Sequence, residues 1–446
     1  MTQGSGPVRE LPQPGDVLHL SRTNEPLLVR ERVGEGGQGV VHRATMSGGE
    51  QLALKWYRPH THSRAQYESI ERLASRPAPH PSFLFPLDTV RATHLTAFGY
   101  VMPWLDPTYV SFASYLNEPR APGLKAKATI GRKLAEAFSA LHTSGLCYRD
   151  INFGNLWVDP VRADVAVIDN DNVGTDDGPV TVLGALRFMA PEVIRRQARP
   201  STVSDLHSLA VLLFYLLMHG HPLDGARVEA SMSWETGRHR TDEELARRHY
   251  GDEPVFVFDP ADVSNRPTIE AGPASWWPVY AGFVRRRFEH AFTVGLRDAS
   301  LSGRVLAGTW RDTLARMYDL CMVCEHCRAA LVFDTDNPDR PCWHCGHVPR
   351  RPNVLDVPRS RCTLVLVDGA RLSRHHVSND RDYDTSIGVV ATDPATGRLA
   401  LRNVSTTRWL AQATDGSAAT VEPGQWLAIR GATVDFGETT GEIRIP

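Results

Sequence analysis

The fold of this chain is decided by YRDINFGNLWV, residues 148–158, and by VAVID, residues 165–169. The first stretch places Asp150 and Asn155 five residues apart, directly before a short apolar run. The second is strand-like and leads straight into Asp169. The two runs predict a hairpin with Asn155 and Asp169 at its two ends. Carboxylate and amide oxygens are ligands that Mg²⁺ prefers when it also carries phosphates. The pattern therefore predicts a magnesium site and leaves Asp150 free to accept a proton.

A glycine-rich segment lies upstream, between two expected strands. Residues 33–41 read VGEGGQGVV and match the pattern G-x-G-x-x-G-x-V. The matching positions are Gly34, Gly36, Gly39 and Val41. Glycines in such a turn let backbone N–H groups approach phosphate oxygens where a Cβ would collide. A strand, and not a helix, follows the last glycine, which argues against the dinucleotide-binding fingerprint.

Together with Lys55 on the next strand, Ala190-Pro191-Glu192 and Asp205, these motifs resemble the eukaryotic-type (bacterial Hanks-type) Ser/Thr protein kinases. The resemblance spans roughly residues 25 to 320. It implies an α+β, bilobal protein kinase fold that uses ATP and Mg²⁺ to phosphorylate Ser/Thr of a partner protein. We expect the N-lobe at residues 25–105 and the C-lobe at 106–319.

The resemblance also assigns roles to individual residues. Asp150 would orient the substrate hydroxyl, Asn155 and Asp169 would hold magnesium, and Lys55 would grip the phosphates. The carbonyl of Pro103 and the N–H of Leu105 would bind the adenine. Asp205 can cap free N–H groups at the start of its helix, and by resemblance it also braces the backbone around Tyr148 and Arg149. The resemblance further implies that Arg304 pairs with Glu192. A buried lysine needs a partner, and by resemblance this is a helix glutamate. Both Glu71 and Glu68 remain open.

Four positions depart from the kinase pattern, and they motivate a rival interpretation. Asn152 stands where a lysine usually neutralises the transferred phosphoryl group, and Ala185 where a threonine usually ties that lysine to the catalytic aspartate. Asn170 and Asp171 replace the phenylalanine and glycine that normally follow the metal-binding aspartate. The alternative is therefore a nucleotide-binding pseudokinase scaffold that assembles a signalling complex.

Two C-x-x-C pairs separated by 14 residues predict a structural zinc ribbon over residues 320–350. Four thiolates on two tight knuckles can reach tetrahedral geometry without a large core. The expected ligands are Cys324, Cys327, Cys342 and Cys345. Nearby side chains could replace one of them, namely Cys321, His326, His344 and His347.

After an expected linker at 351–359, short alternating runs predict an all-β sandwich over 360–446. Its pattern is faintly similar to forkhead-associated domains. The arginine expected after Gly388 for gripping phosphothreonine is Val389. We therefore expect a docking module that does not read phosphate through the usual residues.

Bulk properties restrict the remaining function classes. The 446 residues carry a formal charge of -2, which gives no reason to expect nucleic acid as a partner, even for the ribbon. No apolar run approaches bilayer length and the start lacks a signal-peptide pattern, so we expect a cytoplasmic protein with no membrane partner. Residues 1–24 are expected to be flexible. Bacterial kinases with a C-terminal zinc ribbon suggest a von Willebrand A-type protein and a metal-dependent phosphatase as partners.

Overall fold

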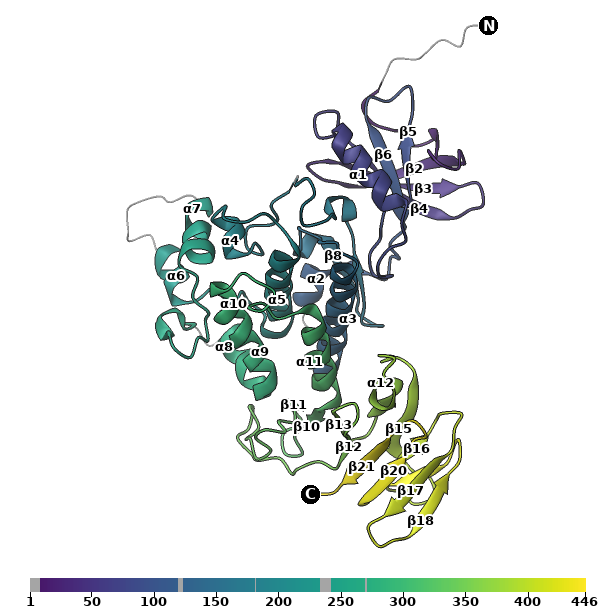
Figure 1. Cartoon of the computed structure of the whole chain (residues 1–446), viewed down its shortest axis with the longest axis vertical. Helices are drawn as coiled ribbons and strands as arrows, with labels where there is room; N and C mark the ends of the chain where they lie inside the picture. Colours follow the sequence, from purple (N-terminus) through teal and green to yellow (C-terminus); the bar gives the residue numbers. More distant parts are fainter. Residues whose placement is uncertain (1–8, 119–122, 181, 233–241, 269–270) are drawn as a thin grey trace. The chain divides into compact units, whose positions relative to one another are not determined.

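The computed structural model describes residues 9–118, 123–180, 182–232, 242–268 and 271–446 (Figure 1). The chain divides into two compact units, and each unit is built from three separate segments of the sequence. The first comprises residues 1–121, 133–268 and 289–308, and the second comprises 122–132, 269–288 and 309–446. The long helix α3 (Leu124–Thr143) contributes residues to both.

Unit 1 begins with an antiparallel six-stranded sheet in the order β1-β2-β3-β4-β6-β5. The strands are β1 Val17–His19, β2 Pro26–Glu35, β3 Gly39–Met46, β4 Gln51–Tyr57, β5 Asp88–Arg91 and β6 Phe98–Pro103. Strand alternation sends Leu52 and Leu54 to one core cluster and Ala53 to another. The second cluster includes Ile70 of helix α1 (Arg64–Ala74), which lies along the sheet (Figure 1).

The expectation that residues 1–24 are flexible is wrong for the part that the structure describes. β1 pairs with β2, where Val17 lies opposite Leu28. Leu18 and Leu20 are buried in the sheet core. Burial of these two leucines and the pairing of β1 with β2 tie the segment to the sheet. Residues 1–8 lie outside the described residues.

The segment after the sheet is mainly helical and carries one small three-stranded sheet, β7-β8-β9. These strands are β7 Val110–Ser111, β8 Leu156–Asp159 and β9 Asp164–Val167. The further helices are α2 Phe112–Leu116, α4 Pro191–Ile194, α5 Thr202–Met218, α6 Ala226–Met232, α7 Asp242–Ala246, α8 Pro273–Trp276, α9 Gly282–Phe292, α10 Val294–Arg297 and α11 Ala307–Asp319. α5 is apolar and almost wholly buried, as expected for a core helix, and a Ser201–Ser204 capping box fixes its start.

Unit 2 contains helix α8, most of helices α9 and α11, a β-hairpin and two larger sheets. The hairpin is β10 (Cys321–Val323) with β11 (Ala330–Val332). The sheets have the orders β13-β12-β21-β20-β17-β18 and β14-β15-β16-β19 and share one apolar core. Their elements are β12 Val354–Val357, β13 Cys362–Val365, β14 Arg371–Ser373, α12 Arg374–Val377, β15 Ser386–Thr392, β16 Leu399–Asn403, β17 Trp409–Ala413, β18 Ala418–Val421, β19 Trp426–Ala428, β20 Ala432–Asp435 and β21 Thr440–Arg444.

The expected linker at 351–359 needs correction, because β12 lies within it. β12 pairs with both β13 and β21, and Leu355 and Val357 are buried in the sandwich core. The sandwich therefore starts near residue 354. β12 has only four residues, which is too short for the alternation of apolar and polar side chains to reveal the strand.

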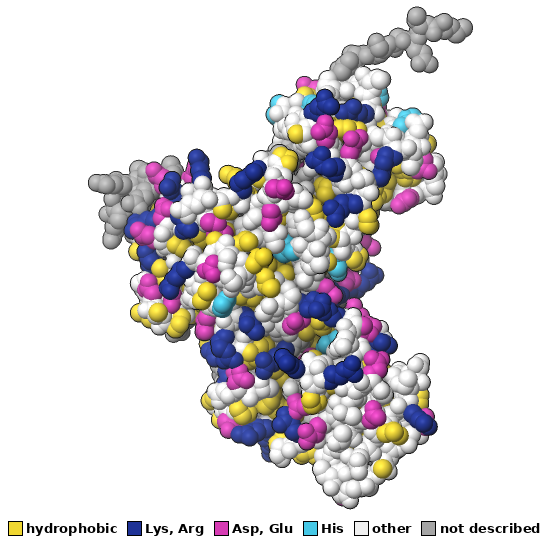
Figure 2. Space-filling view, in the orientation of Figure 1, with side chains coloured by type: hydrophobic (Ala, Val, Ile, Leu, Met, Phe, Trp, Pro, Cys, Tyr) yellow, Lys and Arg dark blue, Asp and Glu magenta, His cyan; other side chains and the backbone are white. Residues whose placement is uncertain are grey.

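Two bulk properties can be followed in the described part of the chain. None of its helices combines the length and apolarity needed to cross a membrane. On the face shown in Figure 2, basic and acidic side chains are interspersed over both units.

Candidate active site and metal centre

The hairpin β8–β9 carries the two expected magnesium ligands. Leu156 pairs with Val167 across it, and the Ile168 N–H donates to the Asn155 carbonyl at 2.9 Å. Asn155 comes just before β8 and Asp169 just after β9, so both lie at the open end of the hairpin, as the spacing predicts. Asp169 adopts a left-handed backbone (φ 57°), which turns the chain sharply after the strand.

Two amide side chains hold Asp150. Asn155 Nδ2 donates to the Asp150 carboxylate at 3.1 Å and to its backbone carbonyl at 3.0 Å. Asn152 Nδ2 makes the equivalent pair of bonds, both at 3.0 Å. The Gly154 N–H fixes Asn152 in turn, through a 2.8 Å bond to its Oδ1. Asn152 thus orients the Asp150 carboxylate, although it cannot supply the positive charge of a lysine.

Asp205 braces the backbone of the Asp150 segment, as the resemblance implies. Its carboxylate accepts the N–H groups of Tyr148 at 2.5 Å and Arg149 at 2.8 Å. Its other expected role, capping helix α5, is wrong, because Ser201 is the N-cap. Asp205 lies in the first turn, where a negative charge still complements the helix dipole.

The glycine-rich turn joins β2 to β3, and the Gly36 N–H closes it by donating to the Gly39 carbonyl at 2.9 Å. A Cβ at Gly39 would lie 2.2 Å from the Trp56 carbonyl oxygen, so this glycine is required by packing against β4. A Cβ at Gly36 would meet nothing within 4 Å. Gly37 is equally open, so the turn leaves room close to the backbone at both positions.

The expected adenine-binding residues lie at the end of the same sheet. Pro103 ends β6 opposite Leu52 of β4. Val41 packs against the cluster that contains Ala53 and Met102. Pro103 and Leu105 are partly exposed, so their backbone groups remain predictions for nucleotide binding.

Lys55 pairs with two aspartates, so the prediction that a helix glutamate is its partner is wrong in this structure. Its Nζ bonds to Asp171 Oδ2 at 2.8 Å and also contacts the Asp169 carboxylate. Glu68 instead pairs with Arg64 at 2.8 Å on the surface of α1. Glu71 is exposed. Tertiary placement of Asp171 decides this pairing.

Asp171 is the functional candidate that the sequence argument treated only as a departure. Its side chain is fully buried, and Tyr57 OH donates to the same Oδ2 that binds Lys55. A signal was available, since a buried lysine needs a partner and an aspartate stood two residues from the metal position. Asn170 is also fully buried, and its Nδ2 donates to the Val167 carbonyl at 3.0 Å.

Electrostatics distinguish the two aspartates. Burial alone would lower the pKa of Lys55, but the Asp171 and Asp169 carboxylates raise it above its ordinary value. Burial and the neighbouring Asp171 raise the pKa of Asp169. Burial would also raise the pKa of Asp171, yet Lys55 and the Tyr57 hydroxyl lower it overall. Asp171 is therefore the firmly ionised partner of Lys55.

Arg149 is a second residue whose contacts were not foreseen. Its guanidinium donates to the backbone carbonyls of Pro179, at 2.6 Å, and Thr175. Its backbone is left-handed (φ 73°). Backbone acceptors thus hold the segment after Asp171 against Arg149.

Glu192 and Arg304 form the expected buried pair. Arg304 Nη2 donates to both carboxylate oxygens of Glu192 at 2.7 Å, and the side chains of Arg304 and Glu192 are 2% and 8% exposed. Such a pair is costly to break, because the remaining charge stays buried without compensation.

We expect Arg304→Met to lower the free energy of unfolding by about 3–5 kcal/mol, because it leaves Glu192 buried and unpaired. Denaturant unfolding of the full chain measures this. Arg297→Met is the matched control, since Arg297 is 77% exposed and lies 4.0 Å from Asp259. Equal stability of both variants would contradict the role assigned to the pair.

The four expected cysteine ligands converge, and their ligand atoms all lie within 4.8 Å of one another. Cys324 Sγ is 3.8 Å from Cys345 Sγ, and Cys327 Sγ is 3.7 Å from Cys342 Sγ. Four sulfurs about 2.3 Å from a tetrahedral zinc ion would be about 3.8 Å apart. The residues therefore fit zinc.

The substitute ligands considered for the ribbon are not part of this group. Cys321 Sγ bonds to the Met317 carbonyl, and His347 Nε2 lies 3.2 Å from Glu325. His326 and His344 also lie outside the group of four.

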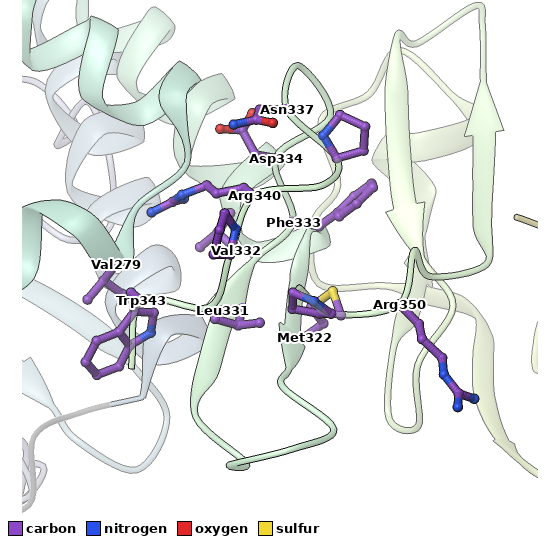
Figure 3. Close-up of a pocket in the computed structure, with 13 residues that line it drawn as sticks. Val279, Met322, Leu331, Val332, Phe333, Asp334, Asn337, Arg340, Trp343 and Arg350 are labelled. Carbon is purple, nitrogen blue, oxygen red and sulfur yellow. The ribbon is translucent and has the colours of Figure 1, made fainter. Parts of the chain in front are cut away.

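A small pocket lies beside the ribbon (Figure 3). Its volume is about 30 Å³, which is room for one water molecule. Asp334, one of its lining residues, accepts the Gly282 N–H at 2.7 Å. The pocket holds none of the catalytic candidates and is too small for a nucleotide.

Comparison with known proteins identifies the family that the site resembles. The protein kinase domain family matches residues 27–248. The Ser/Thr-protein kinase AfsK of Streptomyces coelicolor is 26% identical over 216 residues, which cover 47% of this chain and 26% of AfsK. The Ser/Thr-protein kinase pkn3 of Myxococcus xanthus is 29% identical over 212 residues, covering 42% and 37% respectively. The chain thus spans about a quarter to a third of the length of these relatives.

Proposed function

Because residues 27–248 match the protein kinase domain family, we propose that the chain is an ATP-dependent kinase that transfers the γ-phosphoryl group to Ser/Thr of a partner protein. The observation that carries this proposal is the arrangement of the expected catalytic residues. Lys55 pairs with Asp169, and the Asn155 side chain donates to the Asp150 carboxylate. Asp150 would orient the hydroxyl of the substrate. Asn155 and Asp169 would hold Mg²⁺, which neutralises phosphate charge when bound.

The experiment that tests this proposal is incubation of the purified chain with labelled ATP, Mg²⁺ and a generic Ser/Thr protein substrate. Transfer to serine or threonine that requires Mg²⁺ is the expected result. Phosphate transfer only to a small molecule would contradict a protein substrate.

One observation favours a second candidate, a nucleotide-binding pseudokinase scaffold. Both Asp169 and Asp171 engage Lys55, so its ammonium is already neutralised before any phosphate arrives. Asn152 adds no positive charge near Asp150. A scaffold would bind Mg-ATP yet show no transfer, and the Asp150 variant described below separates the two.

We further propose that the Cys324, Cys327, Cys342 and Cys345 cluster binds a structural zinc ion. Closed four-cysteine sites contribute folding energy directly, because the apo ribbon cannot bury enough surface. Thiolate ligands require reduced cysteines, which supports a cytoplasmic setting.

Cys324→Ser is expected to lose one equivalent of tightly bound zinc, since three thiolates cannot close the site. Elemental analysis of the purified chain measures this loss. His326→Asn is the matched control, because His326 lies within the same knuckle but outside the ligand group. Full zinc content in Cys324→Ser would show that this cysteine is not a ligand.

The C-terminal β-sandwich is proposed to be a protein-docking module related to forkhead-associated domains. Val389 lies opposite Arg371 and Arg402 in the neighbouring strands. Arg371 is already engaged, as it donates to Ser386 Oγ at 2.6 Å and to the Asp384 carbonyl at 3.1 Å. Arg402 lies over the Trp426 ring.

The full chain is expected not to bind phosphothreonine peptides through the sandwich, because Val389 offers no charge-assisted bond to phosphate. Fluorescence titration with a phosphothreonine peptide library measures this. Micromolar binding that is lost both on phosphatase treatment and in Arg371→Gln would refute the prediction. The von Willebrand A-type protein and the metal-dependent phosphatase stay predictions from the resemblance alone.

A further inference from the structure

Unit 2 contains a second cluster of side chains that could bind a metal ion. This cluster consists of Asp319, the last residue of α11, with His375 and His376 of α12 (Figure 1). Their ligand atoms all lie within 4.8 Å of one another. Asp319 and His376 are 4% and 1% exposed, and the His375 side chain is 10% exposed. The cluster is therefore largely removed from water.

The spacing of the cluster suits a small ion bound by nitrogen and oxygen. Asp319 Oδ2 is 3.2 Å from His376 Nε2 and 3.6 Å from His375 Nε2. A tetrahedral zinc ion with bonds of about 2.0–2.1 Å separates its ligand atoms by about 3.3–3.4 Å. The cysteine cluster shows the wider spacing that sulfur requires, so each cluster matches its own ligand type.

The histidine nitrogens lack other partners. Both ring nitrogens of His375 and the Nε2 of His376 are buried, and none makes a hydrogen bond of normal geometry with the described residues. The two rings lie 3.7 Å apart, so two imidazolium cations here would repel each other. A buried polar atom without a partner is unfavourable, because it has lost its hydrogen bonds to water. A bound cation would satisfy one lone pair of each ring.

The surroundings can orient the ligands. His376 Nδ1 lies 3.2 Å from the Ser373 carbonyl oxygen, and donation of Nδ1–H to that oxygen would turn the Nε2 lone pair toward Asp319. A backbone acceptor on the second nitrogen is the usual support of a metal-binding histidine. In the competing tautomer, Nδ1 accepts the Ser373 N–H at 2.9 Å and Nε2 carries the proton toward Asp319. Metal binding and a plain hydrogen bond thus require different tautomers.

The charged groups near the cluster have opposite effects on the binding of a cation: an arginine disfavours it and an aspartate favours it. Arg132 lies 4.3 Å from the centroid of the Tyr383 ring, and the centroids of the tilted Tyr383 and His375 rings are 4.4 Å apart. Asp384 lies 3.6 Å from the same arginine and partly offsets its charge.

We infer that Asp319, His375 and His376 bind a divalent transition-metal ion, zinc being the best match, with a fourth position left for water. Two imidazoles and one carboxylate form a common ligand set for such ions. The ion would join α12 of the sandwich to the end of α11. Metal binding would then contribute directly to the stability of this part of the chain.

The first test is metal analysis and zinc-edge X-ray absorption of the full chain. We expect about two zinc ions per chain, one with sulfur ligands and one with nitrogen and oxygen ligands. Asp319→Asn should lower the content to about one and leave a pure sulfur spectrum. Cys324→Ser should do the reverse and retain the nitrogen and oxygen signal.

Asp312→Asn is the matched control, because Asp312 lies on the same helix and is 64% exposed. His375→Gln serves as a second variant in case Asp319→Asn does not fold. A wild-type chain with one zinc ion and only sulfur ligands overturns the inference and leaves the cluster as a hydrogen-bonded contact. Unchanged zinc content in folded Asp319→Asn or His375→Gln overturns it as well.

Discussion

Replacing Asp150 with alanine is expected to reduce the rate of phosphoryl transfer by about 10²–10⁴-fold, the usual contribution of a positioned acid–base group. The structure gives the reason, since amide donors from Asn152 and Asn155 fix both carboxylate oxygens. No contact joins Asp150 to Lys55 among the described residues, so the affinity for Mg-ATP should change little. Single-turnover transfer and nucleotide titration measure the two quantities separately.

The matched control is Asp164→Asn, in the same hairpin, where the aspartate pairs with Lys133 at the surface. It should leave transfer unchanged. Asp169→Ala should differ from both variants by weakening Mg-ATP binding, because Asp169 is an expected metal ligand. Nucleotide binding without measurable transfer in the wild-type chain, unchanged by Asp150→Ala, would favour the pseudokinase alternative.

Features set by short spacings could be predicted from the sequence. The β8–β9 hairpin is such a case, because two strands and one turn bring Asn155 next to Ile168 and Asp169. The cysteine cluster is another, since each C-x-x-C knuckle sets its own geometry. The buried Glu192–Arg304 pair spans 112 residues and was reached only through the family resemblance.

Features decided by tertiary placement could not be predicted. β1 and β12 have three and four residues and are stabilised by sheets formed elsewhere in the chain. Their local sequences carry too few residues for periodicity to be read. The partner of Lys55 is also decided by tertiary placement. Whether Glu68, Glu71 or Asp171 pairs with Lys55 depends on how α1 and the turn after β9 pack.

The choice of partner for Lys55 has a functional consequence. In this structure the group that neutralises Lys55 lies two residues from the expected metal ligand, and α1 supplies no carboxylate to it among the described residues. Lys55 is then positioned by the short helix after β9, residues Asn170–Asn172, and by Tyr57. The position of Lys55 should therefore not depend on a glutamate of α1.

Asp171→Asn is accordingly expected to impair transfer by about 10–100-fold, or about 1.4–2.7 kcal/mol. It removes one of the two carboxylates that hold the buried Lys55 ammonium, while Asp169 still pairs with it. Glu71→Gln, on the exposed side of α1, should have almost no effect. Initial rates at saturating and limiting ATP measure both variants. Thermal unfolding of each variant shows whether a loss of activity reflects a loss of folded protein.

A double-mutant cycle with Lys55→Met separates positioning from general stability. If Asp171 acts through Lys55, Asp171→Asn should cost much less in the Lys55→Met background than in the wild-type chain. Tyr57→Phe tests the second contact, since it removes only the hydroxyl that donates to Asp171. A large loss in Glu71→Gln or Glu68→Gln, with Asp171→Asn active, would restore the helix glutamate as the partner of Lys55. Equal losses for Asp171→Asn in both backgrounds would show that Asp171 acts on stability alone.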